Sequence, residues 1–239
     1  MKVIYFDIEN TPLLGYAWGT YQQNLLSVEK DTELLCFAYK IGDGKTEVVS
    51  RRNYTERQLV KKLWKLFNEA DVLVAHNGDS FDIKMANQYF MKFNLSPPAP
   101  YKTVDTKKVA KKVGRFAQNK LDYLSQFLLN KKKLHTDISL WFDCMAGDEK
   151  ALKRMEVYNI RDVDLLYAVH KQFLGWTNTQ VNYNVMNDTA HKCPHCGGST
   201  QKRGFAYTRA QKYQRYQCVG ECKGWSTGER IPLTNKVIK

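Results

Sequence analysis

Asp7 and Glu9 stand two residues apart near the N-terminus, in a stretch whose β-branched and aromatic residues predict a strand over 3–8. Because alternate side chains of a strand share a face, the two carboxylates point the same way. Two unpaired carboxylates are costly on a buried strand, and residues 3–12 contain no Lys or Arg. The pair therefore predicts a divalent metal site. The alternative is a strand end that frays into a solvated acidic loop.

Asp82 lies where a further metal ligand is expected. It falls in the first turn of a helix predicted over 81–93, which follows a short apolar strand predicted over 72–75. Open α/β sheets place their sites beyond this end of their strands. An acid also suits the positive end of a helix dipole, so the alternative role of Asp82 is to stabilise the helix.

Asp162 falls in the apolar stripe of a long helix predicted over 148–174. A carboxylate on the buried face of a helix needs a partner, as the acids of the first strand do. One metal cluster satisfies all of these placements, with Asp7, Glu9 and Asp162 sharing one ion. Asp7 would also bridge to a second ion near Asp82. Two Mg²⁺ or Mn²⁺ ions about 4 Å apart are the usual device for in-line cleavage of phosphodiesters.

The pattern of the remaining chain predicts a sheet that positions these acids. We expect strands over 3–8, 33–41, 45–51, 72–75 and 103–105, and helices from Thr55 and over 81–93, 106–113, 119–129 and 148–174. Residues 10–31 are interpreted as a long polar loop whose aromatic residues either stack on single-stranded bases or pack the loop, namely Tyr16, Trp18 and Tyr21. This order of elements predicts an α/β domain with a mixed sheet flanked by helices.

Three motifs in order resemble the DEDD (DnaQ-like) 3′–5′ exonucleases of ribonuclease-H-like fold, in the subgroup with tyrosine in the third motif. The motifs are Phe6-Asp7-Ile8-Glu9, Asn77-x-x-x-Phe81-Asp82 and Tyr158-Asn159-Ile160-Arg161-Asp162, with Leu121-Asp122-x-x-Leu124 between the last two. The likeness covers residues 1–175 and is greatest to the proofreading domains of family-B DNA polymerases and to free-standing relatives such as phage exonucleases. Because the given sequence shows no polymerase domain after these motifs, we do not expect proofreading in cis.

The resemblance implies a catalytic set and a substrate-binding set of residues. The first comprises the carboxylates for two Mg²⁺ or Mn²⁺ ions and a water-orienting tyrosine, namely Asp7, Glu9, Asp82, Asp162 and Tyr158. A tyrosine with a pKa near 10 is a poor base, so the metal must assist deprotonation. The second set would hold the terminal nucleotide and comprises Asn10, Thr11, Asn77 and Lys120. His76 is predicted to be structural, because tyrosine already takes the water-orienting position.

Four cysteines near the C-terminus form two pairs separated by 21 residues, namely Cys193, Cys196, Cys218 and Cys222. In an intracellular chain such a cluster predicts a closed, structural Cys₄ zinc site rather than disulfides. A segment so poor in aliphatic residues would take its folding energy from the metal. The gap in the second pair is one residue longer than usual, which leaves His191 and His195 as alternative ligands.

Two strands predicted over 202–207 and 213–217 lie between the cysteine pairs, and with them the segment resembles the zinc ribbons of transposases and other DNA-binding proteins. Basic residues alternate there with tyrosines, which favours nucleic-acid binding over protein docking. We therefore predict an exonuclease domain over 1–175, a linker over 176–188 and a zinc ribbon over 189–239.

The whole chain is basic, with a net charge of +13 and a pI of about 9.4. Residues 101–133 carry ten Lys or Arg against two acids, and residues 186–239 carry ten against three. This charge predicts a polyanionic partner, nucleic acid before an anionic membrane. The basic residues of 101–133 either contact phosphates or form a solvated face. No apolar run approaches the roughly 20 residues of a membrane span and no secretory signal is present, so we expect a cytoplasmic protein of a bacterial or phage-infected cell.

The sequence thus predicts a metal-dependent 3′–5′ exonuclease that acts on single-stranded 3′ ends, with DNA favoured over RNA, and whose ribbon binds nucleic acid. Replication or repair proteins are further possible partners. One alternative is an endonuclease or strand cutter of the same fold. Another is a DNA-binding accessory protein whose nuclease site is vestigial.

Overall fold

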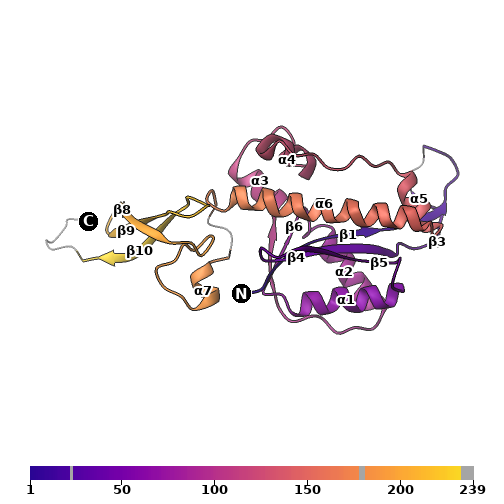
Figure 1. Cartoon of the computed structure of the whole chain (residues 1–239), viewed down its shortest axis with the longest axis horizontal. Coiled ribbons are helices and arrows are strands. Elements are labelled where there is room, and N and C mark those ends of the chain that lie inside the picture. Colours follow the sequence, from indigo (N-terminus) through magenta and orange to yellow (C-terminus); the bar gives the residue numbers. More distant parts are fainter. Residues whose placement is uncertain (22–23, 178–180, 233–239) are drawn as a thin grey trace.

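The computed structural model describes residues 1–21, 24–177 and 181–232, and its largest element is a five-stranded sheet (Figure 1). Its strands are β1 (Val3–Asn10), β4 (Leu34–Ile41), β5 (Thr46–Ser50), β6 (Val72–Ala75) and β7 (Lys102–Asp105). They lie in the order β5-β4-β1-β6-β7. Because β1 pairs antiparallel with β4 and parallel with β6, the sheet is mixed, as the sequence predicts.

Helices cover both faces of this sheet. One face packs against α1 (Glu56–Asn68) and α2 (Asp82–Lys92). The other packs against α3 (Thr106–Val113), α4 (Leu121–Leu129) and α6 (Glu149–Phe173). Figure 1 shows α6 running along the sheet, with α3 and α4 on its outer side and α1 and α2 across the sheet from it. The sheet and its helices therefore form three layers.

Side-chain caps mark the starts of α1 and α6. Thr55 closes a reciprocal capping box with Gln58 at the start of α1. Asp148 caps α6 by accepting a hydrogen bond from the N–H of Ala151. Both helices begin within a residue or two of their predicted starts.

β1 is buried on both faces, as its composition predicts. Ile4, Phe6 and Ile8 are at most 3% exposed and join the core beneath α1 and α2, whereas Tyr5 joins the core beneath α6. Burial of each such large side chain stabilises the fold by about 1.5–3 kcal/mol. Asp7 and Glu9 share the face of Tyr5, so the fold directs both carboxylates toward α6.

Residues 10–31, interpreted from the sequence as a loop, contain a two-stranded hairpin of β2 (Leu14–Tyr16) and β3 (Ser27–Lys30), and residues 22–23 lie outside the described part. Strands of three and four residues are too short to show the alternation that identifies a strand. The hairpin forms a sheet of its own and does not extend the central sheet.

The side chains of three hairpin aromatics are largely exposed, at 59% for Tyr16, 81% for Trp18 and 99% for Tyr21. These exposures leave little surface for packing inside the loop, one of the two roles expected for them, and base stacking stays a prediction. A second unpredicted element, α5 (Ser139–Met145), lies between α4 and α6 in the sequence and buries Leu140 against α6.

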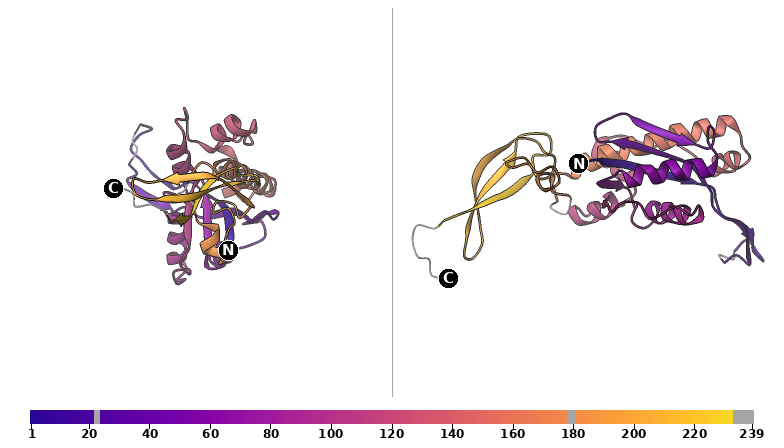
Figure 2. Two further views of the ribbon diagram at one scale, coloured as in Figure 1. Left: turned by 90° about the vertical axis from the view of Figure 1, so that its left-hand side faces the viewer. Right: turned by 90° about the horizontal axis from the view of Figure 1, so that it is seen from below.

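A second sheet follows α6 and consists of β8 (Thr200–Tyr207), β9 (Lys212–Cys218) and β10 (Trp225–Ile231), in the order β10-β9-β8. A short helix, α7 (Tyr183–Asn187), precedes it within the predicted linker. Parts of the predicted linker (178–180) and of the predicted ribbon (233–239) lie outside the described residues. β10 was not predicted because its sequence is mostly polar. Figure 2 shows this sheet beyond the C-terminal end of α6.

Two glycines permit close contact between α6 and the cysteine segment. A Cβ added to Gly175 would lie 2.0 Å from the carbonyl oxygen of Cys222, and one added to Gly224 would lie 3.0 Å from the Cα of Gly175. Any larger residue at either position would therefore collide with backbone. Among the described helices, none is long and apolar enough to cross a membrane.

Candidate functional site

β1 and α6 bring three of the predicted carboxylates together. Oxygen atoms of Asp7, Glu9 and Asp162 all lie within 4.8 Å of one another. Asp7 and Glu9 are half-buried, and Asp162 is 2% exposed. Asn159, one turn before Asp162 and fully buried, donates from Nδ2 to Oδ2 of Asp7 at 2.7 Å. Residues about 150 positions apart in sequence are thus fixed in one cluster.

Asp82 adjoins this cluster from the first turn of α2. Its Oδ1 accepts a hydrogen bond from the backbone N–H of Ile8 at 3.2 Å, and the residue is 3% exposed. Its position next to β1 is the one expected for the ligand of a second ion. Asp82 is not part of the group whose oxygens lie within 4.8 Å of one another.

Burial raises the pKa values of all four acids, and repulsion within the set adds to this for Asp7 and Glu9. Desolvation, followed by the charges of Asp82 and Glu9, raises the pKa of Asp7 well above its usual value. Desolvation raises the pKa of Glu9 to about 8 and that of Asp82 to about 7. Desolvation also raises the pKa of Asp162, against the opposing effect of Lys133. When all four acids are ionised, the neighbouring groups of the protein therefore compensate only part of their negative charge.

Lys133 is a member of the site that the sequence analysis missed. It follows α4, and its Nζ forms an ion pair with Oδ2 of Asp162 and lies 3.5 Å from the hydroxyl of Tyr158. Burial alone would lower the pKa of this lysine, but the charge and hydrogen bond of Asp162, together with the effects of Tyr158 and Asp7, outweigh burial and raise it. A cation from a distant part of the chain thus accompanies the carboxylates, although residues 3–12 contain no Lys or Arg.

One carboxylate oxygen in the cluster has no hydrogen-bond partner. Oδ1 of Asp162 is buried and unpaired, although Oδ2 of the same group is paired with Lys133. A buried, ionised oxygen without a partner is costly. Carboxylate oxygens are the ligands that Mg²⁺ and Mn²⁺ prefer, so Asp7, Glu9 and Asp162 fit a divalent ion.

Tyr158 stands beside the cluster on α6, one turn before Asp162. Its ring packs edge-to-face on Trp141 of α5, with the ring centroids 5.9 Å apart. Burial, followed by the charge of Asp162, raises the pKa of Tyr158 to about 12. Its hydroxyl therefore keeps its proton at neutral pH, as the sequence analysis assumed.

A cleft of about 510 Å³ opens beside Glu9 and is lined by Asn10, Thr11, Phe81, Ile138 and Trp141 among others. Nδ2 of Asn10 is buried without a partner, while its Oδ1 accepts from the hydroxyl of Tyr89 at 2.7 Å. The N–H of Thr11 already donates to the carbonyl of Glu33 at 2.8 Å. Asn10 therefore offers an unused donor at this cleft, whereas the backbone N–H of Thr11 does not.

The other two residues predicted to bind substrate lie apart from the carboxylates. Asn77 has a positive φ of 69°, and its Oδ1 accepts from Nζ of Lys107 at 3.1 Å. Lys120 is exposed at the start of α4. His76 bonds Thr106 through Nδ1 and the carbonyl of Asn119 through Nε2, at 2.9 and 3.0 Å. Burial lowers the pKa of His76 to about 4, which fits its predicted structural role.

The four C-terminal cysteines converge. Their sulfur atoms all lie within 4.8 Å of one another, and the contacts Cys193–Cys222, Cys196–Cys222 and Cys196–Cys218 measure 3.5, 3.4 and 3.7 Å. A tetrahedral ZnS₄ site with Zn–S bonds of about 2.3 Å would place its sulfurs about 3.8 Å apart. The cluster therefore fits a zinc ion. His195 instead approaches the carbonyl of Trp225, with Nε2 at 3.2 Å.

Comparisons with known proteins agree with this fold. Residues 4–174 match the family model RNase_H_2, described as RNase_H superfamily. A solved structure of the family B DNA polymerase from the hyperthermophilic archaeon Pyrobaculum calidifontis is similar, with a TM-score of 0.52 and 16% identity over 73% of this chain. At that identity the likeness shows the fold alone, and the chain spans only 26% of the polymerase. None of the curated proteins matches this chain.

Proposed function

This chain belongs to the RNase H superfamily, and we propose that it is a metal-dependent 3′–5′ exonuclease. The observation that carries the proposal is the buried cluster of Asp7, Glu9 and Asp162, with oxygens within 4.8 Å and one oxygen of Asp162 unpaired. Asp82 adjoins the cluster and Tyr158 completes the tyrosine form of the third motif. The resemblance of these motifs to DEDD exonucleases is the basis for proposing that hydrolysis starts at the 3′ end.

Each residue of the site has a defined task in phosphodiester hydrolysis. When bound, two Mg²⁺ or Mn²⁺ ions would supply a nucleophile at neutral pH and stabilise charge on the phosphate. Asp7, Glu9, Asp82 and Asp162 would hold them, with Asn159 fixing the carboxylate of Asp7. These contacts determine where the ions sit relative to the substrate.

Tyr158 and Lys133 would act on the water and the phosphate. Because burial keeps the Tyr158 hydroxyl protonated, it orients the attacking water by hydrogen bonding and does not take its proton. The ammonium group of Lys133 lies 3.5 Å from that hydroxyl and would face the phosphate on which negative charge grows. A fixed cation at this position stabilises the transition state more than the ground state.

The cleft beside Glu9 would receive the terminal nucleotide. Phe81 and Ile138 at its rim are 47% and 57% exposed, so apolar surface is available to a base. The unpaired Nδ2 of Asn10 would donate to the sugar or base. Single-stranded DNA is the favoured substrate, because only an unpaired end brings a free base to such a cleft.

We propose the domain division predicted from the sequence, with the exonuclease domain in residues 1–175 and the ribbon in 189–239. The Cys₄ site would hold one structural Zn²⁺, and the ribbon would bind nucleic acid. The sulfur separations of 3.4–3.7 Å support the zinc site.

Digestion of 5′-labelled single-stranded DNA and RNA of one sequence, with Mg²⁺ or Mn²⁺, tests this proposal. A ladder that shortens from the 3′ end is expected, and Asp7→Ala should lower the rate roughly a thousandfold or more. Asp79→Ala is the matched control, since Asp79 pairs with the exposed Lys108 outside the cluster. Asp7→Ala with activity near that of the wild type would sink the mechanism, and cleavage of a circular strand would favour the endonuclease alternative.

One observation favours the accessory-protein alternative. The ion pair of Lys133 with Asp162 already compensates one carboxylate without any metal. If the site were vestigial, the protein would bind single-stranded DNA but would neither cleave it nor bind Mn²⁺. Calorimetric titration with Mn²⁺ therefore separates the two functions.

A further inference from the structure

The second sheet carries a hollow of about 400 Å³ that the proposed catalytic site does not use. It is lined by Val181, Asn182, His195, Arg215 and Trp225, together with neighbouring polar residues of β10. Among the described residues, no acidic side chain lines it. The hollow thus combines an aromatic ring with a cation.

Arg215 and Trp225 form the chemical centre of this hollow. The guanidinium carbon of Arg215 lies 4.7 Å from the ring centroid of Trp225. Nε of Arg215 donates to the carbonyl of Arg203 at 3.2 Å, which holds the group in place. Within the described residues, Arg215 takes part in no ion pair. A planar cation stacked on an exposed aromatic ring binds a phosphate and a base together.

The two faces of this sheet differ. Arg215 pairs with Thr227 and Gln217 pairs with Trp225, so these residues share one face. Lys202 pairs with Tyr216 and therefore lies on the opposite face. Arg215 and Trp225 lie on the first face, and Lys202 is not among the residues that line the hollow, so the charge of the ribbon alone does not define the site.

The hollow has a fixed place relative to the carboxylates. Gly224, next to Trp225, lies against Gly175 just beyond the end of α6. Asp162 is eleven residues before Phe173, the last residue of α6, which corresponds to about 16 Å at 1.5 Å per residue. The hollow lies beyond this end of α6, so a stacked strand that rises about 3.4 Å per nucleotide needs at least about five nucleotides to reach it.

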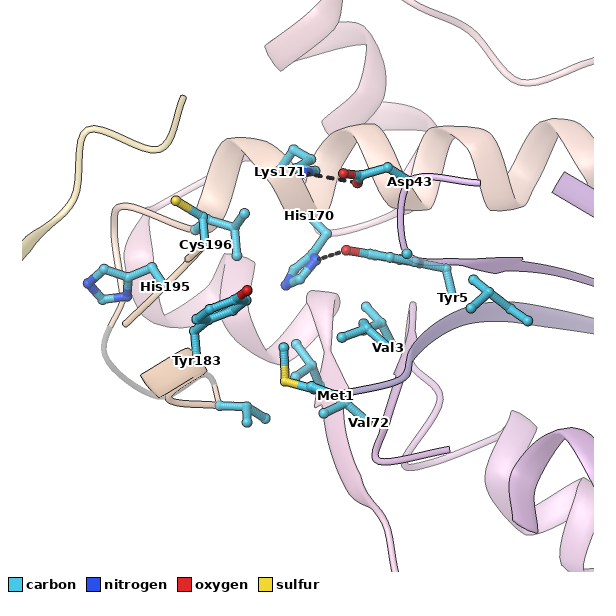
Figure 3. Close-up of a pocket in the computed structure, with 16 residues that line it drawn as sticks. Met1, Val3, Tyr5, Asp43, Val72, His170, Lys171, Tyr183, His195 and Cys196 are labelled. Atoms are coloured by element: carbon cyan, nitrogen blue, oxygen red, sulfur yellow. Dashed lines mark hydrogen bonds and ion pairs between the residues drawn. The ribbon is translucent and has the colours of Figure 1, made fainter. Parts of the chain in front are cut away.

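Basic residues lie on the helices beside α6, between the carboxylates and the ribbon. Lys111, Lys112 and Arg115 are exposed on or just after α3, which packs on α6. Figure 1 shows α3 above the half of α6 that leads to the second sheet. The junction itself is visible in Figure 3, where Tyr183 and His195 face His170 and Tyr5 across a cavity. A strand leaving the carboxylates in this direction would meet positive charge before it reaches Arg215.

We propose that the hollow around Arg215 and Trp225 binds the substrate strand at least about five nucleotides upstream of its 3′ end. The occupant is single-stranded nucleic acid, with a phosphate on the guanidinium and a base on the indole. The inference rests on the proposed exonuclease activity. It makes the enzyme sensitive to substrate length, because a strand of four nucleotides cannot reach the hollow and one of eight or more can.

The test is a length series of single-stranded DNA from 4 to 20 nucleotides, degraded by the full-length protein with Mn²⁺. We expect kcat/KM to rise about tenfold between roughly five and eight nucleotides because KM falls, as fits a stacking contact of moderate strength. Arg215→Gln should abolish this rise. Arg215→Lys should keep only part of it, because an ammonium cannot reproduce the planar stack. Lys202→Gln, which removes the same charge from the other face, should keep it in full. Bound zinc, measured for each variant, shows that the ribbon remains folded.

The outcomes separate this proposal from the exonuclease proposal. Equal loss in Arg215→Gln and Lys202→Gln, or a length profile that Arg215→Gln leaves unchanged, would overturn the role of the hollow. Absence of cleavage at every length would overturn the exonuclease instead. Binding of a fluorescent 20-mer in EDTA does not depend on cleavage, and it should weaken about tenfold in Arg215→Gln and not in Lys202→Gln.

Discussion

Lys133 compensates a carboxylate that is almost completely buried, so its removal tests the electrostatics of the site directly. Lys133→Met keeps most of the alkyl chain and removes the ammonium group. Asp162 is then left with its side chain 2% exposed and with no cation beside it, apart from any bound metal. The variant thus isolates the charge and retains most of the packing.

The expected cost follows from the burial of the pair. Loss of one partner from a buried ion pair costs about 3–5 kcal/mol, because the other charge stays buried and uncompensated. The Lys133 side chain is itself 27% exposed, so solvent screens part of the interaction and the lower end applies, about 3 kcal/mol. Such a loss changes the folding equilibrium by about a hundredfold.

Two conditions should reduce this cost if the reasoning is correct. Without Lys133, Asp162 takes up a proton more readily, so the destabilisation measured at pH 8 should shrink at pH 5. Saturating Mn²⁺ supplies positive charge to the same carboxylates, and the difference from the wild type should then fall to about 1 kcal/mol or less.

Urea unfolding of both proteins in EDTA at pH 5 and pH 8, and in Mn²⁺ at pH 8, measures these differences. Lys132→Met is the control, since its exposed side chain forms no ion pair within the described residues. An equal loss of stability under all three conditions would refute the argument, because alkyl packing alone would then account for it.

Three further predictions test other parts of the molecule. Tyr158→Phe keeps the packing on Trp141 but lacks the hydroxyl, so kcat should fall about a hundredfold with unchanged Mn²⁺ affinity by calorimetry; unchanged kcat would remove the tyrosine from the reaction. Cys193→Ser should reduce bound zinc from one per chain to none, by elemental analysis, and unfold the ribbon while a 4-mer is still degraded; full zinc content would contradict the Cys₄ assignment. In EDTA the melting temperature should fall as the pH rises from 5 to 8. In the folded protein the pKa values of Asp82 (about 7) and Glu9 (about 8) are raised, so the contribution of these protonated acids to stability is complete below their unfolded-state pKa values. It is lost as the pH rises through the folded-state values and the acids ionise. Mn²⁺ should abolish that decline, and a flat melting profile in EDTA would contradict the burial argument.

Much of the central fold is predictable because its signals are local. The alternation of Ile4, Phe6 and Ile8 identifies a strand buried on both faces, and Thr55 and Asp148 mark the starts of their helices. The placement of Asp162 in an apolar helical stripe indicates a buried acid. Each of these inferences needs only the few residues around it, and the structure brings the predicted acids to one place.

The missed features depend on contacts between distant segments. Lys133 looked like one of many surface lysines, because nothing in its neighbourhood shows that the loop after α4 turns toward Asp162. The β2–β3 hairpin and β10 consist of short or polar strands that are held by pairing and not by an apolar pattern. A periodic pattern of apolar residues identifies elements that bury one face, and these segments bury few of their side chains.

The charge of the cluster argues that the site is retained for a ligand. Four acids lie together, and within the described residues Lys133 is the one cation that forms an ion pair with any of them. Such a group costs stability in the free protein, as the raised pKa values show. Two divalent cations would neutralise the four carboxylates, and the remaining charge of Lys133 would match a single phosphodiester. The charges of the site would therefore balance only with both metal and nucleic acid bound, which is the state that the proposed hydrolysis requires.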